Sequence, residues 1–229
     1  MKRIGILGGM GPAATAELYL AIVGQFQRRF GARYDADFPQ MIINSVPAPD
    51  VVEKLEDEAE LVEVLQQGVR TLEVAGADFV AVACNTVHAF HGAIAAAVSI
   101  PVLNLLEETA AAVEHAGHRR VGVLGTGLTI RRGLYREACR HRGIAVVEPN
   151  ALQQEALTQL ILDVLAGGDP ERCRGRLAGL IDALRAAGSE AVILGCTDLS
   201  GIVPPAPAVV LFDTTRILAE AAVNEATRP

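Results

Sequence analysis

The chain has 229 residues, of which 51% are hydrophobic and 21% charged, and its formal net charge is −7. An acidic chain of ordinary globular composition is poorly suited to nucleic acid or an anionic membrane, since both attract basic patches. It has no apolar run of bilayer length and no signal-like first segment, so we expect a cytoplasmic protein.

Apolar, β-branched runs alternate along the chain with Ala- and Leu-rich stretches of helical period. The runs predict strands at Arg3–Leu7, Gln40–Asn44, Phe79–Ala83, Val102–Asn104, Arg120–Leu124, Ala145–Val147, Ala191–Leu194 and Val209–Phe212. The helical stretches are Ala14–Phe30, Glu58–Ala75, Leu134–Arg142, Leu152–Ala166 and Arg174–Ala187. This alternation predicts an α/β fold with mostly parallel sheets flanked by helices.

Three stretches of the first half are echoed, in the same order, in the second half. "KRIGILGGM" matches "RRVGVLGTG", "AGADFVAVACNT" matches "AGSEAVILGCTD", and "PVLNLLEET" matches "VVLFDTTRI". Such a repeat predicts two pseudo-symmetric lobes. We assign residues 1–105 and about 213–229 to the first lobe and residues 106–212 to the second, with a C-terminal helix from Thr215 returning to the first.

The first glycine loop, Gly9-x-Gly11-x-x-Ala14, is close to a dinucleotide-binding fingerprint. That fingerprint needs an acidic residue after the second strand, where this chain has Asn44 and Ser45. Backbone N–H groups around Gly11, at the start of a helix, could instead bind a small carboxylate. A glycine turn that binds nothing is the other alternative.

Cys84 and Cys196 each follow an apolar strand, at equivalent places of the repeat. Parallel sheets bind ligands at the carboxyl ends of their strands, and an unperturbed thiol has a pKa near ~8.5. Two such groups facing one carbon suit two-base proton transfer, which inverts a stereocentre. Polar residues that could bind a carboxylate follow the same strands: Asn85, Thr86, Thr126, Thr129 and Thr197.

Other polar residues suggest no cofactor. His88 and His91 could pair with Cys84 or bind a metal, but capping or solvated histidines are the simpler interpretation. Cys139 and Cys173 lie in helical stretches and are expected to be inert. There is no zinc-like cysteine spacing, and the only lysines, Lys2 and Lys54, are poorly placed for a Schiff base. We therefore expect neither a metal nor an organic cofactor.

The stretches "GILGGMGPAAT", "ACNTVH" and "GCTDL" resemble the aspartate/glutamate racemase superfamily, in particular its aspartate racemase branch. The resemblance implies cofactor-independent racemisation in a cleft between two lobes, within a homodimer. It also implies that Cys84 and Cys196 are the acid/base pair and that Met10, Asn85, Thr86, Thr126 and Thr197 line the substrate. The glutamate branch is less similar, since its usual histidine after the second Cys-Thr is Asp198 here.

Two departures from that branch concern the substrate. Val51 replaces an arginine that usually follows "P-x-P-D", and Leu165 and Ala166 stand where a helix lysine is usual. Without these cations a side-chain carboxylate would be poorly paired, so aspartate is a doubtful substrate and a neutral or varied amino acid is at least as good a match. A maleate isomerase-like or decarboxylase-like activity, or an amino-acid-binding module without turnover, remains an alternative. Whether His88 or Asp198 assists the cysteines is open.

Overall fold

The computed structural model describes residues 1–229 and divides into two compact units. Unit 1 consists of Met1–Pro49, Glu56–Leu105 and Thr215–Pro229, and unit 2 consists of Asp50–Leu55 and Leu106–Thr214. Each unit contains a parallel sheet with helices packed against it, which confirms the predicted α/β class. None of the helices is both long and apolar enough to cross a membrane.

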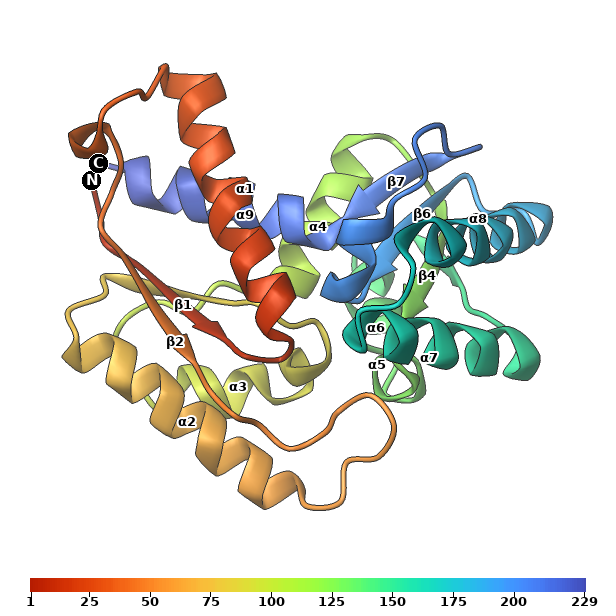
Figure 1. Ribbon diagram of the computed structural model, residues 1–229, viewed down its shortest axis with the longest axis horizontal. Coiled ribbons are helices and arrows are strands. Elements are labelled where there is room, and N and C mark those ends of the chain that lie inside the picture. The colour runs from red at the N-terminus through yellow and green to blue at the C-terminus, as the bar shows by residue number, and fades with distance from the viewer. The chain divides into compact units, whose positions relative to one another are not determined.

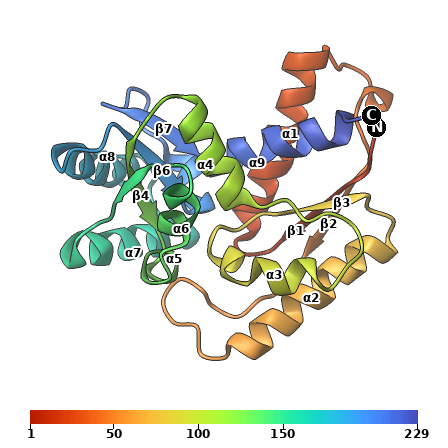
Figure 2. The same ribbon diagram turned by 180° about the vertical axis from the view of Figure 1, so that it is seen from behind.

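The sheet of unit 1 has three parallel strands in the order β2-β1-β3. They are β1 (Ile4–Gly8), β2 (Met41–Ser45) and β3 (Phe79–Val82). Figure 2 shows these strands side by side, with α2 and α3 on one side of them and α1 and α9 on the other. The helical segments are α1 (Pro12–Phe30), η1 (Asp35–Asp37), α2 (Glu58–Val74), η2 (Thr86–Phe90), α3 (His91–Ala95) and α9 (Thr214–Thr227).

The two faces of this sheet follow from the alternation of side chains along β1. Ile4 and Ile6 belong to a core cluster with Leu18, Ile22 and Phe26 of α1. Gly5 and Leu7 point the other way, where a Cβ on Gly5 would lie 3.4 Å from that of Leu72 in α2. Both faces of the strand are therefore covered, which explains why its sequence is apolar throughout.

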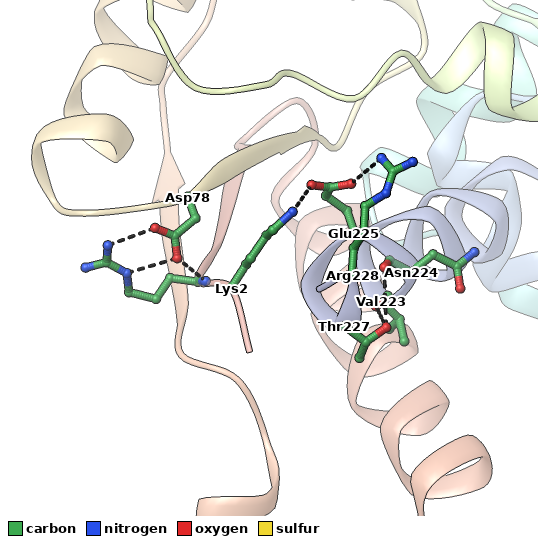
Figure 3. A network of polar contacts seen from close by, with 8 residues as sticks. Lys2, Asp78, Val223, Asn224, Glu225, Thr227 and Arg228 are labelled. Atoms are coloured by element: carbon green, nitrogen blue, oxygen red, sulfur yellow. Dashed lines mark hydrogen bonds and ion pairs between the residues drawn. The ribbon is translucent and has the colours of Figure 1, made fainter.

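The last helix of the chain completes unit 1. Its residues Leu218, Ala222, Val223 and Ala226 are buried in the same cluster as α1. The backbone N–H of Lys2 donates to the carbonyl of Ala226 over 2.9 Å. Figure 3 shows the ammonium group of Lys2 beside Glu225, which it contacts at 2.6 Å, and Arg228 on the same carboxylate. Figure 1 accordingly shows the two termini next to each other.

The sheet of unit 2 has four parallel strands in the order β5-β4-β6-β7. They are β4 (Arg120–Gly125), β5 (Ala145–Val147), β6 (Ala191–Gly195) and β7 (Val210–Asp213). Leu124, Val192 and Leu194 pack against α7 and α8, which Figure 1 shows side by side. The helical segments are α4 (Leu105–His115), α5 (Gly127–Arg131), α6 (Leu134–Arg140), α7 (Ala151–Leu165), α8 (Pro170–Ala186) and η3 (Thr197–Ile202).

Short polar side chains set where several helices begin. The Asp57 carboxylate accepts the backbone N–H groups of Ala59 and Glu60 at the start of α2. Asn150 and Gln153 form a capping box at the start of α7, and Asp169 with Pro170 opens α8. These caps satisfy N–H groups that have no partner inside the helix.

One predicted strand is wrong. The stretch Val102–Asn104 makes only an isolated parallel bridge between Val80 and Val102. Pro101 has no N–H to extend a ladder before this bridge, and after it the N–H of Leu105 donates to Nε2 of His88 over 3.2 Å rather than to β3. The chain then turns directly into α4.

Candidate active site

The first glycine loop joins β1 to α1 through backbone approaches that only glycine permits. Gly9 has φ +98°, and a Cβ there would lie 2.2 Å from the carbonyl oxygen of Val46. The hydroxyl of Thr15 accepts the N–H of Gly9 and donates to the carbonyl of Gly11, each over 2.9 Å. The peptide bond between Met10 and Gly11 is cis. The two hydrogen bonds of the Thr15 hydroxyl fix the loop that carries the predicted substrate residues Met10 and Gly11.

The residue at the end of β2 differs from the one that a dinucleotide-binding site has at this place. Asn44 occupies the place where such a site has an acidic residue, and its amide donates to the Gly68 carbonyl of α2 over 3.0 Å. That side chain is engaged with the neighbouring helix. The geometry thus agrees with the sequence in disfavouring a ribose-binding role for this strand end.

The end of β3 carries the first predicted cysteine. Cys84 is 4% exposed, and Asn85 and Thr86 beside it are buried. Because β1 and β3 pair in parallel, this turn and the glycine loop lie at the same edge of the sheet. Unit 1 therefore brings Met10, Gly11 and the Cys84 turn together at one sheet edge.

His88 lies one turn after Cys84 but does not bond its thiol. Its Nδ1 lies 2.7 Å from the carbonyl oxygen of Cys84, and the N–H of Leu105 donates to its Nε2 over 3.2 Å. Burial lowers the pKa of His88 to about 4, so the ring is neutral near pH 7. The predicted alternative of a Cys84–His88 nucleophile pair is therefore not supported by the geometry.

The end of β6 carries the second predicted cysteine, which has an acidic neighbour. Cys196 is 5% exposed, and its Sγ lies 3.5 Å from Oδ2 of Asp198. Burial raises the pKa of the Asp198 carboxyl, while the bond from the thiol opposes that shift. A thiolate beside a carboxylate is disfavoured by like charge, so these two groups are suited to share one proton.

The end of β4 contributes two buried threonines. Thr126 caps α5, because its hydroxyl accepts the N–H of Thr129 over 3.2 Å, and the two hydroxyls are 3.1 Å apart. The amide of Gln154 donates to the carbonyl of Gly125 over 3.1 Å and supports the turn from α7. Since β4 and β6 are adjacent and parallel, unit 2 brings Thr126 and Thr129 to the same sheet edge as Cys196 and Thr197.

Val51 lies in the segment Asp50–Leu55, which packs as part of unit 2. The Asp50 carboxylate accepts the N–H groups of Val52, Glu53 and Lys54, which folds the segment into a tight turn. Val51 is 8% exposed and Val52 packs against the core cluster of unit 2. An apolar residue at position 51 thus fits its surroundings.

The remaining cysteines and histidines form no further site. Cys139 and Cys173 are buried in helices, and burial raises the pKa of Cys139 to about 11. None of the four cysteines is in a disulfide. No group of three His, Cys, Asp or Glu side chains is arranged to hold a metal ion.

Sequence patterns did not indicate one residue that shapes the Cys196 turn. Tyr135 of α6 is fully buried, and a Cβ on Gly195 would lie 3.0 Å from its ring. The phenol of Tyr135 bonds the Thr109 side chain, and burial raises its pKa. A buried tyrosine in a helix has no sequence signal of its own, although the glycine before Cys196 indicates a close approach.

Comparison with known proteins gives a consistent set of relatives. Residues 7–222 match the family model described as Asp/Glu/Hydantoin racemase. The chain is 31% identical over 222 residues to the broad specificity amino-acid racemase RacX of Bacillus subtilis, covering 96% of each protein.

Solved structures agree with this result. The aspartate racemase of Picrophilus torridus superimposes with a TM-score of 0.86 at 26% identity, covering 100% of this chain and 96% of the other. The glutamate racemase of Aquifex pyrophilus is more distant, with a TM-score of 0.61 at 16% identity, covering 97% and 83%. That second likeness concerns the fold alone.

Proposed function

Because the chain belongs to the Asp/Glu/Hydantoin racemase family, we propose that it is a cofactor-independent racemase of free amino acids. One observation carries the proposal: the order β2-β1-β3 of unit 1 recurs as β5-β4-β6 in unit 2, and a buried cysteine follows the equivalent strand, β3 or β6. A pure binding module does not require two thiols at these places. The broad specificity of the relative RacX also favours a racemase over an isomerase or decarboxylase of the same superfamily.

In the proposed mechanism, Cys84 and Cys196 act on one substrate α-carbon. The thiolate of one cysteine takes the α-proton and becomes a thiol, which leaves the electron pair delocalised into the substrate carboxylate. The thiol of the other cysteine gives its proton to the opposite face and becomes a thiolate. Asn85, Thr86, Thr126, Thr129 and Thr197, with the loop at Met10 and Gly11, supply donors to the carboxylate as negative charge develops there.

We propose a neutral or broad range of amino acids as substrates. Val51 offers no cation for a second carboxylate, and its turn is held by the Asp50 carboxylate, which accepts backbone N–H groups. The broad specificity of the relative RacX supports this choice. Aspartate would need another cation to pair its side chain.

We further propose that the enzyme works as a homodimer in the cytoplasm. The proposed chemistry needs both site cysteines as thiols, and a reducing compartment such as the cytoplasm keeps cysteines in that form. Sedimentation equilibrium on the purified protein tests the dimer, and a single monomeric species at assay concentration would refute it.

The function is tested by incubating the protein with each L-amino acid in deuterated water. Chiral chromatography measures racemisation, and NMR measures exchange of the α-proton. We expect at least one amino acid to racemise, and no turnover with any of them, with the fold intact, would refute the proposal. Conversion of maleate in a parallel incubation would favour a maleate isomerase-like activity, and release of carbon dioxide from an amino acid would favour a decarboxylase-like activity.

The two-base mechanism is tested with Cys84→Ser and Cys196→Ser. Each should lower racemisation by about 10²–10⁴-fold, because a hydroxyl is almost never ionised. Each variant should still exchange the α-proton of one enantiomer, and the two variants should prefer opposite enantiomers. Cys173→Ser is the matched control, a buried cysteine in α8 that should keep the wild-type rate. The same enantiomer preference in both site variants would refute the mechanism.

A further inference from the structure

We propose that His88 is a positioning residue that holds Cys84 in place for proton transfer through a neutral ring of fixed tautomer. The inference rests on the proposed function and assigns a role to a histidine that takes no part in the proton transfer itself. It is carried by the contacts of the ring and by the backbone of Cys84.

The partners of the ring determine which nitrogen carries the proton. A carbonyl oxygen only accepts and a backbone N–H only donates. Nδ1 therefore carries the proton that binds the Cys84 carbonyl at 2.7 Å, and Nε2 accepts the N–H of Leu105 at 3.2 Å; the backbone of Leu103 also interacts with the ring. Both nitrogens are occupied, so the ring has none left for the thiol or for a substrate. The ring is also buried, which favours its neutral form.

Hydrogen bonds hold the backbone of Cys84 at both its N–H and its carbonyl, and His88 provides the bond at the carbonyl. The N–H of Cys84 donates to the carbonyl of Val82 over 2.9 Å, and the preceding N–H, of Ala83, donates to Leu7 in β1 over 2.9 Å. The carbonyl of Cys84 binds His88, whose other nitrogen is bonded at the start of α4. The Cα of Cys84 is thus held from both sides, which limits where its thiol can lie.

The carbonyl of the second cysteine bonds the backbone of its own turn. The carbonyl of Cys196 accepts the backbone N–H of Leu199 over 3.2 Å, as in an ordinary turn. Loss of the His88 bond should therefore disturb proton transfer at Cys84 and spare proton transfer at Cys196. This asymmetry distinguishes a positioning role from a general contribution to folding.

Three variants separate the two bonds of His88. His88→Asn places an amide N–H near the position of Nδ1 and keeps the donor to Cys84. His88→Gln places its amide near Nε2 and keeps the partner of Leu105, and His88→Phe removes both bonds but keeps a ring. We expect His88→Phe and His88→Gln to lower kcat by about 10²-fold, since a displacement of about 1 Å has this effect, and His88→Asn to recover most of the rate.

His91→Phe is the matched control. Its ring stacks on that of His88 with centroids 5.8 Å apart, and its Nε2 bonds Val102 rather than a site residue. It should lose less than about 3-fold in kcat, because a single hydrogen bond away from the reacting groups is removed.

Isotope effects show which cysteine is affected. The enantiomer that Cys196→Ser still exchanges is the one that Cys84 deprotonates. With that enantiomer deuterated at the α-carbon, the isotope effect on kcat/KM should rise in His88→Phe, because the step at Cys84 becomes more strongly rate-limiting. With the opposite enantiomer deuterated, the isotope effect on kcat/KM should fall, because Cys196 removes the deuteron and the slower step is then the return of a proton from Cys84. Unchanged isotope effects with a lower rate, or better recovery by Gln than by Asn, would overturn the proposal.

Alkylation by iodoacetamide tests the same role without racemisation. Mass spectrometry gives the rate at each cysteine, and His88→Phe should change the rate at Cys84 by more than about 3-fold while leaving Cys196 unchanged. Equal changes at both thiols, or at neither, would overturn the proposal. A wild-type protein that racemises no amino acid would refute the proposed function separately.

Discussion

The buried neutral His88 should make the stability of the protein depend on pH in a predictable way. Its pKa is about 4 in the folded protein, against 6.5 for an unperturbed histidine, because burial disfavours the charged ring and His91 stacks against it. A depressed pKa means that the unfolded chain binds the proton first. The contribution is therefore complete above about pH 6.5 and is lost as the pH falls toward 4. At ~1.4 kcal/mol per pKa unit, the loss is about 3 kcal/mol.

The assay is urea unfolding followed by circular dichroism at several pH values from 4 to 8, for the wild type and for His88→Asn. Carboxylates such as Asp78, whose pKa is lowered to about 2 by Arg3, also change stability with pH in both proteins. The difference between the two proteins isolates His88. The advantage of the wild type should shrink by about 3 kcal/mol between pH 7 and pH 4. A difference that stays constant over this range would refute the argument.

Four further predictions follow from the site. Asp198→Asn should gain stability relative to the wild type as the pH rises from 3 to 7, because the raised pKa of Asp198 makes its ionised form costly; urea unfolding measures this. Thr15→Val should cost about 1–3 kcal/mol in the same assay, because the Gly9 N–H loses its acceptor. Val51→Arg should raise turnover of aspartate relative to neutral amino acids about tenfold, measured as a ratio of kcat/KM values. Dialysis against a chelator and hydroxylamine should leave the racemisation rate unchanged.

Hydrophobic patterns were sufficient to predict the sheets but not every strand. β1 and β6 are runs of buried residues, as is β4 after Arg120, and their patterns predicted strands within one residue of the observed ends. The stretch at Val102 has the same kind of pattern and is not a strand. Its outcome was decided by Pro101 and by the bond from the N–H of Leu105 to His88, and neither contributes to an apolar pattern.

The internal repeat indicated both site cysteines, and the positions just after the predicted strands indicated the polar residues around them. The partners of His88 and Asp198 could not be predicted in the same way. Both residues lie in short turns, η2 and η3, where no periodicity fixes the direction of a side chain. Nothing in the sequence indicates that Asp50–Leu55 packs within unit 2, since its hydrophobic residues, Val51, Val52 and Leu55, follow neither a helix period nor a strand alternation.

The burial of α9 in unit 1 has a consequence for how the chain folds during its synthesis. Residues Leu106–Thr214 must all be made before α9 appears, which takes about 5–20 s at ~5–20 residues per second. Throughout this time Ile4, Ile6 and Phe79 lack the cover that Leu218, Ala222 and Val223 give them in the finished core. Unit 2, which is nearly continuous in the chain, can complete its own core first. The part of the protein made first is thus the last to become fully folded, and a nascent chain that stops before Thr215 exposes an apolar surface to chaperones or to aggregation.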